Sequence, residues 1–307
     1  MPFRLQQSPG LAYLGLTLTT LFWAGNAVVA RSVVDTIPPV SLAFWRWVLA
    51  LVILLPIGLP GIRRHWTVIL ANWRPLLVLA VFSVSCFNTL LYQAAITTTV
   101  LNITLVNSTV PVVVALMAWL LLGDRMRSPQ VLGIALALLG MLVIIGRGEL
   151  ATFRRLDFQP GDLWMVAAVL CWALFSVLLR RHQIPLPAFT FLTVQVAMGT
   201  LVLLPLYLVD ALILSGGFSL TPTVVPPLLY VAIFPGILAY AFWNHGVHQV
   251  GPSRSAMFMY LNPVFAAVLA GLFLDERLSL FHLAGGLLIL AGLFLATRSR
   301  PAPRPTP

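Results

Sequence analysis

Charged side chains are scarce in this chain of 307 residues: Asp, Glu, Lys and Arg make up 8% of it, whereas hydrophobic residues make up 60%. Soluble domains average about 25% charged residues. A soluble chain this apolar could not cover its surface with polar groups, so the composition excludes the soluble protein classes. The mean hydropathy of +0.99 indicates that lipid is the solvent.

Lysine is absent, and all 18 basic residues are arginine, which gives a net charge of +10. In a soluble protein this charge would suggest nucleic-acid binding. Here the arginines lie at the ends of apolar runs, where they set orientation in a membrane, so we expect a lipid bilayer as partner and no nucleic acid. The two cysteines, Cys86 and Cys171, fall inside apolar runs and form neither a disulfide framework nor a metal-ligand spacing.

Acidic residues are absent from the centres of the apolar runs. The eight acids lie in loops or at run ends: Asp35, Asp124, Glu149, Asp157, Asp162, Asp210, Asp275 and Glu276. Proton-coupled pumps usually hold a carboxylate inside a helix, so tight proton coupling is not indicated and facilitated efflux is at least as compatible. A His-Glu-x-x-His motif and a phosphate-binding glycine loop are also missing. We expect no enzyme, no metal and no cofactor.

Apolar runs are what the sequence contains instead, and each has about 18–23 residues, enough to cross a hydrocarbon core as a helix. The ten runs lie at 11–30, 38–58, 75–96, 100–122, 129–146, 162–179, 186–208, 226–247, 254–274 and 279–297. No convincing small-residue cleavage site follows the first run before Arg31, so we read it as a retained span and not as a signal peptide. The sequence predicts an all-α membrane protein with ten transmembrane helices.

An internal repeat relates the two halves of the chain. One set of residues recurs 152 positions later, namely Pro111, Asp124, Arg125, Gly133 and Gly140 as Pro263, Glu276, Arg277, Gly285 and Gly292. Trp23 and Trp172 are 149 positions apart. We therefore predict two five-helix repeats at 11–146 and 162–297, with a lead at 1–10, a linker at 147–161 and a tail at 298–307.

Orientation follows from the arginines. With the N-terminus in the cytoplasm, the inside segments carry 12 arginines and the outside segments 5. The positive-inside rule then predicts that both termini are cytoplasmic and that the linker at 147–161 lies on the opposite, periplasmic side. Five helices is an odd number, so the halves are inverted, as is common in secondary transporters.

Polar and aromatic residues inside the runs are the candidate substrate-binding residues, because polar groups in a bilayer usually face the protein interior. They are Trp23, Asn26, Arg46, Asn88, Tyr92, Trp172, Tyr240, Trp243, Asn244, Tyr260 and Asn262. The aromatic rings would supply stacking walls, the asparagines hydrogen bonds, and Arg46 a contact to an anion. Pro111 and Pro263 are predicted to kink or gate their helices.

Each candidate has a purely structural alternative. Tryptophan and tyrosine near helix ends often anchor a helix at the membrane interface. We apply this interpretation to Trp45, Trp47, Trp66 and Trp73 and leave them out of the site. Asparagines such as Asn88 can also serve as hydrogen-bonding contacts between helices.

Arg46 is the most specific single candidate, because it is a charged residue deep inside a predicted membrane helix. It lies about 12 Å into its helix, at 1.5 Å per residue, and its repeat mate at offset 149 is the uncharged Gln195. A substrate carboxylate is one partner for it. The alternatives are a carbonyl at a helix C-terminus and a side chain that reaches toward the lipid headgroups.

The repeated pattern of proline, Asp/Glu-Arg and paired glycines resembles that of the EamA-type drug/metabolite transporter superfamily over about residues 11–297. The segment Phe22-Trp23-Ala24-Gly25-Asn26 and the nine tryptophans look most like the YddG-type aromatic amino-acid exporters. The resemblance implies a basket of ten transmembrane helices around a central cavity, with the fifth and tenth on the outside. It also implies a place in the bacterial inner membrane and export of amino acids and related metabolites. The alternatives are export of other amphipathic metabolites or drugs, or a lipid or amphiphile flippase. We expect a small-molecule substrate and a monomer.

Overall fold

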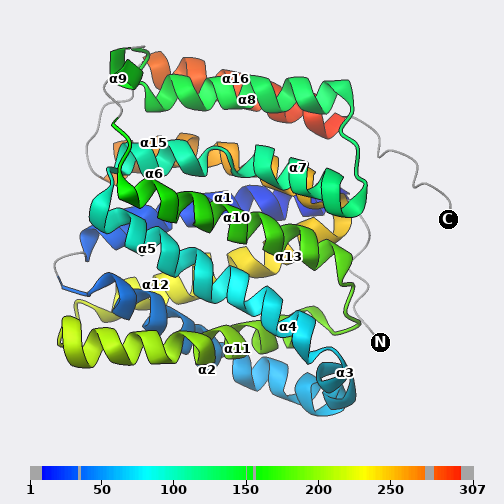
Figure 1. The fold of residues 1–307 in the computed structure, drawn as a ribbon, viewed down its shortest axis with the longest axis vertical. Helices are drawn as coiled ribbons and strands as arrows, with labels where there is room; N and C mark the ends of the chain where they lie inside the picture. Colours follow the sequence, from blue (N-terminus) through cyan, green and yellow to red (C-terminus); the bar gives the residue numbers. More distant parts are fainter. Residues whose placement is uncertain (1–8, 34–35, 150, 155–156, 274–279, 299–307) are drawn as a thin grey trace.

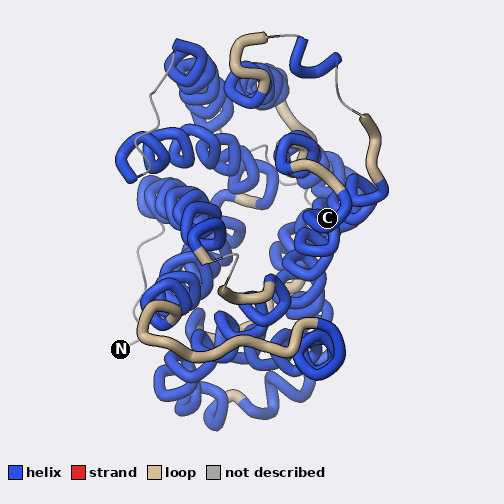
Figure 2. Tube along the Cα trace, turned by 90° about the vertical axis from the view of Figure 1, so that its left-hand side faces the viewer, coloured by secondary structure: helices blue, strands red, loops and turns tan. Residues whose placement is uncertain are grey.

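The computed structural model describes residues 9–33, 36–149, 151–154, 157–273 and 280–298, and within these ranges every residue lies in a helix or in a connecting turn or loop (Figure 1, Figure 2). The prediction of an all-α protein is therefore confirmed. The side chain of Tyr92, a predicted site residue, lies outside what the structure describes.

The helices follow one another along the whole described chain. In the first half they are α1 (Pro9–Ser32), α2 (Pro39–Arg64), α3 (Trp66–Ala71), α4 (Trp73–Ala80), η1 (Val81–Cys86), α5 (Phe87–Thr97), α6 (Val100–Asn107), α7 (Val110–Leu122) and α8 (Ser128–Ile145). In the second half they are α9 (Ala151–Arg154), α10 (Pro160–Arg181), α11 (Ala188–Val209), η2 (Asp210–Leu214), α12 (Val225–Val231), η3 (Ala232–Leu238), α13 (Ala239–Val250), α14 (Pro252–Met257), η4 (Phe258–Leu261), α15 (Asn262–Phe273) and α16 (Leu280–Arg298).

Eight helical segments of the described residues are long and apolar enough to cross a membrane: Val40–Arg64, Trp73–Leu91, Asn102–Leu122, Ser128–Ile145, Pro160–Arg181, Ala188–Leu214, Val225–Val250 and Leu280–Thr297. A helix satisfies its backbone hydrogen bonds within itself, as a bilayer requires, so the chain is a multi-pass membrane protein. The other two predicted runs fall on α1 and on α14 to α15, and the count of ten crossings stays a prediction.

Two predicted helix ends are wrong. The second helix does not end at residue 58, because α2 continues to Arg64 with Pro56 and Pro60 inside it. The seventh does not end at residue 208, because α11 continues through η2 to Leu214. A proline removes one backbone hydrogen bond, but neighbouring helices make such a loss tolerable in a membrane protein, so proline is a weak stop signal here.

The helix is interrupted before each of the two predicted kink prolines. α6 ends at Asn107, and the hydroxyls of Ser108 and Thr109 donate to the carbonyls of Leu105 and Val106 at 2.5 and 2.6 Å. Such local bonds compete with the helix ladder, and α7 begins only at Val110. In the second half the chain tightens into the 3-10 segment η4 just before α15 and Pro263.

Two π-helical segments occupy equivalent places in the two halves. η1 joins α4 to α5 and η3 joins α12 to α13, and their first residues lie 151 positions apart, between the predicted offsets of 149 and 152. A π turn is wider than an α turn and disturbs the regular hydrogen-bond ladder, and such turns frequently mark functional sites. η1 contributes the carbonyls of Ser83 and Val84 to the candidate site described below, and the carbonyl of Pro235 in η3 accepts from Trp23 Nε1 at 3.4 Å.

α8 and α16 pack side by side at one end of the molecule (Figure 1), which agrees with the outside position implied for the fifth and tenth helices. A Cβ atom on Gly133 would lie 2.5 Å from the carbonyl oxygen of Gly292, and one on Gly140 would lie 2.5 Å from that of Gly285. Only residues without a side chain let two helices approach so closely. The register is antiparallel and uses the glycines of the sequence repeat.

Candidate functional site

Three tryptophans from three helices meet in the interior. The ring centroids of Trp23 on α1 and Trp172 on α10 are 5.2 Å apart, and Trp243 on α13 lies 5.4 Å from Trp23 and 5.3 Å from Trp172. Trp172 and Trp243 are fully buried, whereas Trp23 is partly exposed. We call these three residues the tryptophan triad. The repeat mates Trp23 and Trp172, 149 positions apart in sequence, are therefore direct neighbours in space.

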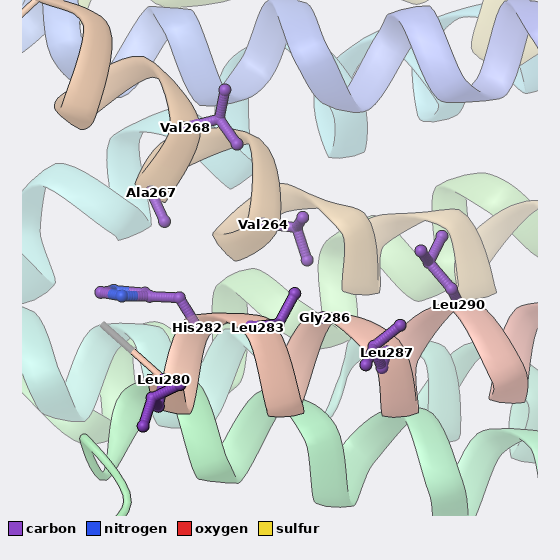
Figure 3. A pocket seen from close by; sticks show the side chains of 9 residues that line it. All are labelled: Val264, Ala267, Val268, Leu280, His282, Leu283, Gly286, Leu287 and Leu290. Carbon is purple, nitrogen blue, oxygen red and sulfur yellow. The ribbon is translucent and has the colours of Figure 1, made fainter. Parts of the chain in front are cut away.

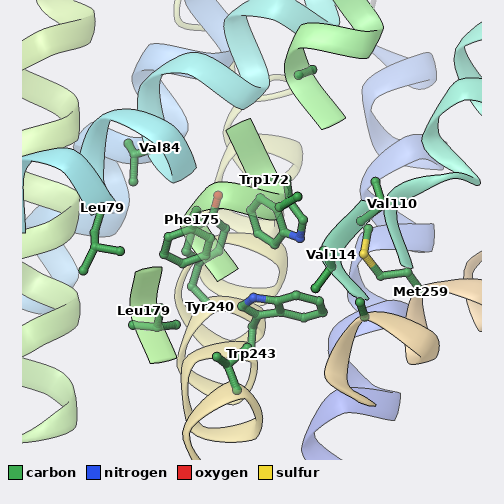
Figure 4. Close-up of a cluster of buried hydrophobic side chains, with 14 of the residues drawn as sticks. Leu79, Val84, Val110, Val114, Trp172, Phe175, Leu179, Tyr240, Trp243 and Met259 are labelled. Carbon is green, nitrogen blue, oxygen red and sulfur yellow. The ribbon is translucent and has the colours of Figure 1, made fainter. Parts of the chain in front are cut away.

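More aromatic rings extend the triad toward α2. Tyr240 lies 5.8 Å from Trp172 and 4.9 Å from Trp47, and its hydroxyl donates to the carbonyl oxygen of Ser83 at 2.8 Å. Figure 4 shows Trp172, Tyr240 and Trp243 packed together inside the bundle. Edge-to-face pairs at these distances contribute beyond the burial of apolar area, so the triad and Tyr240 form one aromatic wall.

Trp47 corrects a prediction. We took it for an interface anchor, but it is 0% exposed and packs on Tyr240. Trp66 and Trp73, in contrast, are 53% and 48% exposed, as interface anchors would be. A signal was available, because the small residues Ala43 and Ala50 share the helix face of Trp47 at spacings of four and three and are buried with it.

Arg46 is buried inside the protein, with 4% of its surface exposed. Its Nη2 donates to Asn88 Oδ1 at 3.2 Å, and its Cζ lies 4.6 Å from the centre of the Trp47 ring. Nε has no hydrogen-bond partner, and among the described residues no carboxylate pairs with this cation. This burial favours an interior role over the alternative in which Arg46 reaches the lipid headgroups. A buried cation without a counter-anion is costly.

A second buried polar chain runs from α4 to α13. Ser83 Oγ donates to the carbonyl oxygen of Leu79 at 2.6 Å, Gln195 Nε2 donates to Ser83 Oγ at 2.8 Å, and Asn244 Nδ2 donates to Gln195 Oε1 at 3.1 Å. Ser83 and Gln195 are 0% exposed and Asn244 is 7% exposed. Neither Ser83 nor Gln195 was among the predicted site residues. Gln195 could have been found, because it is polar, mid-helix and the repeat mate of Arg46.

Contacts join seven of the predicted residues into one set: Trp23, Arg46, Asn88, Trp172, Tyr240, Trp243 and Asn244. Asn26 lies one turn after Trp23 and is partly exposed, and Asn262 begins α15. Tyr260 is fully buried, but its hydroxyl has no partner among the described groups. These three stay outside the connected set, and the role of every candidate in substrate binding stays a prediction.

A separate pocket of about 440 Å³ lies between α15 and α16 (Figure 3). His282 is the one polar residue of a lining that otherwise consists of Val264, Ala267, Val268, Leu280, Leu283, Gly286, Leu287 and Leu290. Leu280, Leu283 and Leu287 are 85%, 63% and 60% exposed, so this pocket belongs to the outer surface. Within the described residues no cluster of three or more His, Cys, Asp or Glu side chains could hold a metal ion.

The described fold is that of a multi-pass α-helical membrane protein, and it buries polar and aromatic side chains from both halves of the chain in its interior. A family model described as the EamA-like transporter family matches residues 10–146 and 159–298. The chain belongs to this family, and it is therefore a transporter and not an enzyme.

Relatives and solved structures are similar to this chain over more than half of its length. An uncharacterized transporter of Bacillus subtilis, YyaM, is 28% identical over 290 residues, which cover 93% of either chain. A "Probable terminal-alkyne amino-acid exporter" of Streptantibioticus cattleyicolor is 27% identical over 94% of this chain and 93% of its own. A "Probable amino-acid metabolite efflux pump" of Salmonella typhimurium is 32% identical over 56% and 59%. A crystal structure with 20% identity matches at a TM-score of 0.77 over 94% and 97% and supports the fold alone.

Proposed function

We propose that this chain is a secondary transporter of the bacterial inner membrane that exports amino acids, chiefly aromatic and other apolar ones, and related metabolites by alternating access. The observation that carries the proposal is Arg46, a buried cation beside Trp47 with no carboxylate partner among the described residues. A substrate carboxylate would supply the missing anion, and the aromatic wall would receive an apolar side chain. Two relatives whose names mention amino acids support the proposal that the substrate is an amino acid.

The proposed architecture is ten transmembrane helices in two inverted repeats, 11–146 and 162–297. The glycine register supports it. A twofold axis that exchanges Gly133 with its repeat mate Gly285, and Gly140 with Gly292, turns the contact of Gly133 with Gly292 into that of Gly285 with Gly140, and both contacts are present. In transporters with inverted repeats, substrates bind near the midplane where the repeats meet, and the triad contains mates from both repeats.

Both termini should face the cytoplasm, because the inside segments of that topology hold 12 arginines against 5 outside. We expect a reporter enzyme that works only in the cytoplasm to be active when it is fused after Arg304, and a reporter that works only in the periplasm to be silent there. The reverse pair of results would contradict the topology. A fusion within 147–161 is the internal control, because this linker should give the opposite readout.

The proposed function is tested with purified protein in sealed liposomes. Phenylalanine, threonine, a sugar and an organic cation are supplied in turn, and the initial rate of uptake is compared with that of protein-free liposomes. We expect phenylalanine to move fastest, threonine more slowly, and the sugar and the cation at the background rate. If no amino acid moves faster than the background, the proposal is wrong.

Trp23 should contribute to selectivity for aromatic substrates. Replacing it with alanine removes one ring of the triad, and the lost stacking, worth about 0.5–1.5 kcal/mol beyond area burial, predicts a roughly three- to tenfold loss of phenylalanine transport. Threonine has no ring to stack, so its transport should change less. Trp172→Ala should act in the same direction, and Trp66→Ala, at an exposed tryptophan, is the control. Equal losses for both amino acids would mean that the triad serves packing only.

The apolar pocket between α15 and α16 favours one alternative, the transport of amphiphiles or lipids. Its lining is apolar except for His282, and it lies against exposed leucines of α16. This alternative predicts that a fluorescent phospholipid crosses protein-containing liposomes faster than protein-free ones. It also predicts that Gly286→Leu, which would fill the pocket, slows the lipid and leaves phenylalanine transport unchanged.

A further inference from the structure

The polar chain of Ser83, Gln195 and Asn244 has a fixed direction. It starts at the backbone carbonyl of Leu79, which can only accept a hydrogen bond. Ser83 uses its single hydrogen on this carbonyl, so its oxygen can only accept from Gln195 Nε2. The amide of Gln195 must therefore turn its oxygen toward Asn244 Nδ2. This orients Asn244 so that its Oδ1, buried and without a partner, is the free end, and that end is an acceptor.

Asn88 and Arg46 form another polar chain, and this one ends in a donor instead of an acceptor. It starts at the backbone carbonyl of Val84, which accepts from Asn88 Nδ2 at 3.3 Å. The amide oxygen of Asn88 must then face Arg46, and it accepts from Nη2. The free end of this chain is the guanidinium of Arg46, whose Nε is buried without a partner. This end is a cation and a donor.

Both free ends lie near Tyr240. Arg46 lies over the ring of Trp47, which packs on Tyr240, and Asn244 lies one helical turn after Tyr240 on α13 and so shares its helix face. Both chains start on one continuous stretch of helix, at the carbonyl of Leu79 near the end of α4 and at that of Val84 in the adjoining segment η1. A molecule bound beside Tyr240 would meet a buried donor from Arg46 and a buried acceptor from Asn244.

We propose that the two chains recognise the two charges of a zwitterionic α-amino acid: Asn244 Oδ1 accepts a hydrogen bond from the α-ammonium, and Arg46 donates to the α-carboxylate. Ser83 and Gln195 are positioning residues that hold Asn244 with its oxygen toward the substrate. The inference rests on the proposed function and adds that a free α-ammonium is required. A substrate without it leaves the buried oxygen of Asn244 unpaired, and sites built around such a group reject the incomplete analogue strongly.

The first test uses the unmodified protein in liposomes with three molecules of similar shape. Phenylalanine has both charges, 3-phenylpropionate lacks the ammonium, and 2-phenylethylamine lacks the carboxylate. Hydrogen bonds to charged groups are strong enough that losing one should reduce transport efficiency roughly ten- to hundredfold. We therefore expect phenylalanine to exceed each analogue by at least about tenfold.

The second test replaces Asn244, the residue proposed to accept a hydrogen bond from the α-ammonium. In Asn244→Leu, phenylalanine transport should fall to within about threefold of 3-phenylpropionate transport, because neither molecule then finds the acceptor. The transport of 3-phenylpropionate itself should not fall and should rise toward that of phenylalanine, because the variant no longer has a buried oxygen that this analogue leaves unpaired. Asn72→Leu is the matched control, since Asn72 donates to the carbonyl oxygen of Val68 between α3 and α4, outside the site.

Gln195→Met and Ser83→Ala test the positioning role and serve if Asn244→Leu fails to fold. Neither change removes a group that touches the substrate, but both release the orientation of Asn244. We expect the ratio of phenylalanine to 3-phenylpropionate transport to fall in both, whereas a loss of packing alone would lower both rates and leave the ratio intact.

The outcomes separate this inference from the proposed function. If the unmodified protein moves no amino acid, both are wrong. If it moves phenylalanine and 3-phenylpropionate equally well, or if Asn244→Leu lowers both by the same factor, amino-acid transport stands and the assignment of Asn244 is overturned.

Discussion

Replacing Arg46 with glutamine is expected to reduce the transport of carboxylate substrates roughly ten- to hundredfold, the worth of a lost charge-assisted hydrogen bond. Glutamine can still donate to Asn88 Oδ1, and the other repeat carries it at the equivalent place, where Gln195 is fully buried. The protein should fold at least as well as before, because the change removes a buried cation whose desolvation costs several kcal/mol. Activity and stability should therefore move in opposite directions.

The measurement combines phenylalanine uptake in liposomes with thermal unfolding in detergent. Arg74→Gln is the matched control, because Arg74 also lies over a tryptophan, 5.5 Å from the ring of Trp73, but is exposed. We expect this control to change neither quantity. If Arg46→Gln transports phenylalanine like the unmodified protein, Arg46 does not bind the carboxylate. If it also unfolds at a lower temperature, the arginine has a structural role.

Replacing Gly140 with leucine is expected to have the largest effect on stability, about 3 kcal/mol or more, at the upper end of what overpacking costs. Its Cβ would lie 2.5 Å from the carbonyl oxygen of Gly285 and 2.9 Å from the backbone nitrogen of Ile289. Backbone atoms cannot move aside as the end of a flexible side chain can, so α8 and α16 would have to separate. Gly133→Leu should behave alike, because it meets the backbone of Gly292 in the equivalent contact.

Thermal unfolding and the yield of folded protein in detergent test this prediction. Gly286→Ala is the control on the same helix, because its Cβ would meet only Val264, at an ordinary 3.9 Å, and alanine is the better helix former. Gly140→Ala and Gly285→Ala disturb one shared contact, so their effects should not add. If Gly140→Leu unfolds like the unmodified protein, the close packing of α8 on α16 is not needed for stability.

Much of the architecture could be read from the sequence. The apolar runs required membrane helices, because a bilayer offers no partner for an unpaired backbone group, and eight spans of the described residues follow them. The offset of 149 placed Trp23 and Trp172 in equivalent helices, and their rings are in contact. The recurring glycines marked the internal repeat, but only the structure shows that they form the close contact of α8 with α16.

The tertiary structure decided which side chains meet. Trp45 and Trp47 look alike in the sequence, yet Trp47 is fully buried whereas Trp45 is partly exposed. Lipid is as apolar as the protein interior, so an apolar helix carries little periodic signal of which face turns inward. The exposed and buried faces of α2 and α11 therefore had to be seen in the packed bundle.

Only the tertiary structure shows which end of each polar chain donates a hydrogen bond and which end accepts one. Residue types told us that Arg46, Asn88 and Asn244 carry polar groups, but an amide can present either its oxygen or its nitrogen. That choice is made by the backbone carbonyls of Leu79 and Val84, which reach the site from α4 and the π-helical segment η1. The sequence determined that the membrane interior would hold polar residues, whereas only the packing of the helices determined which of them end as donors and which as acceptors.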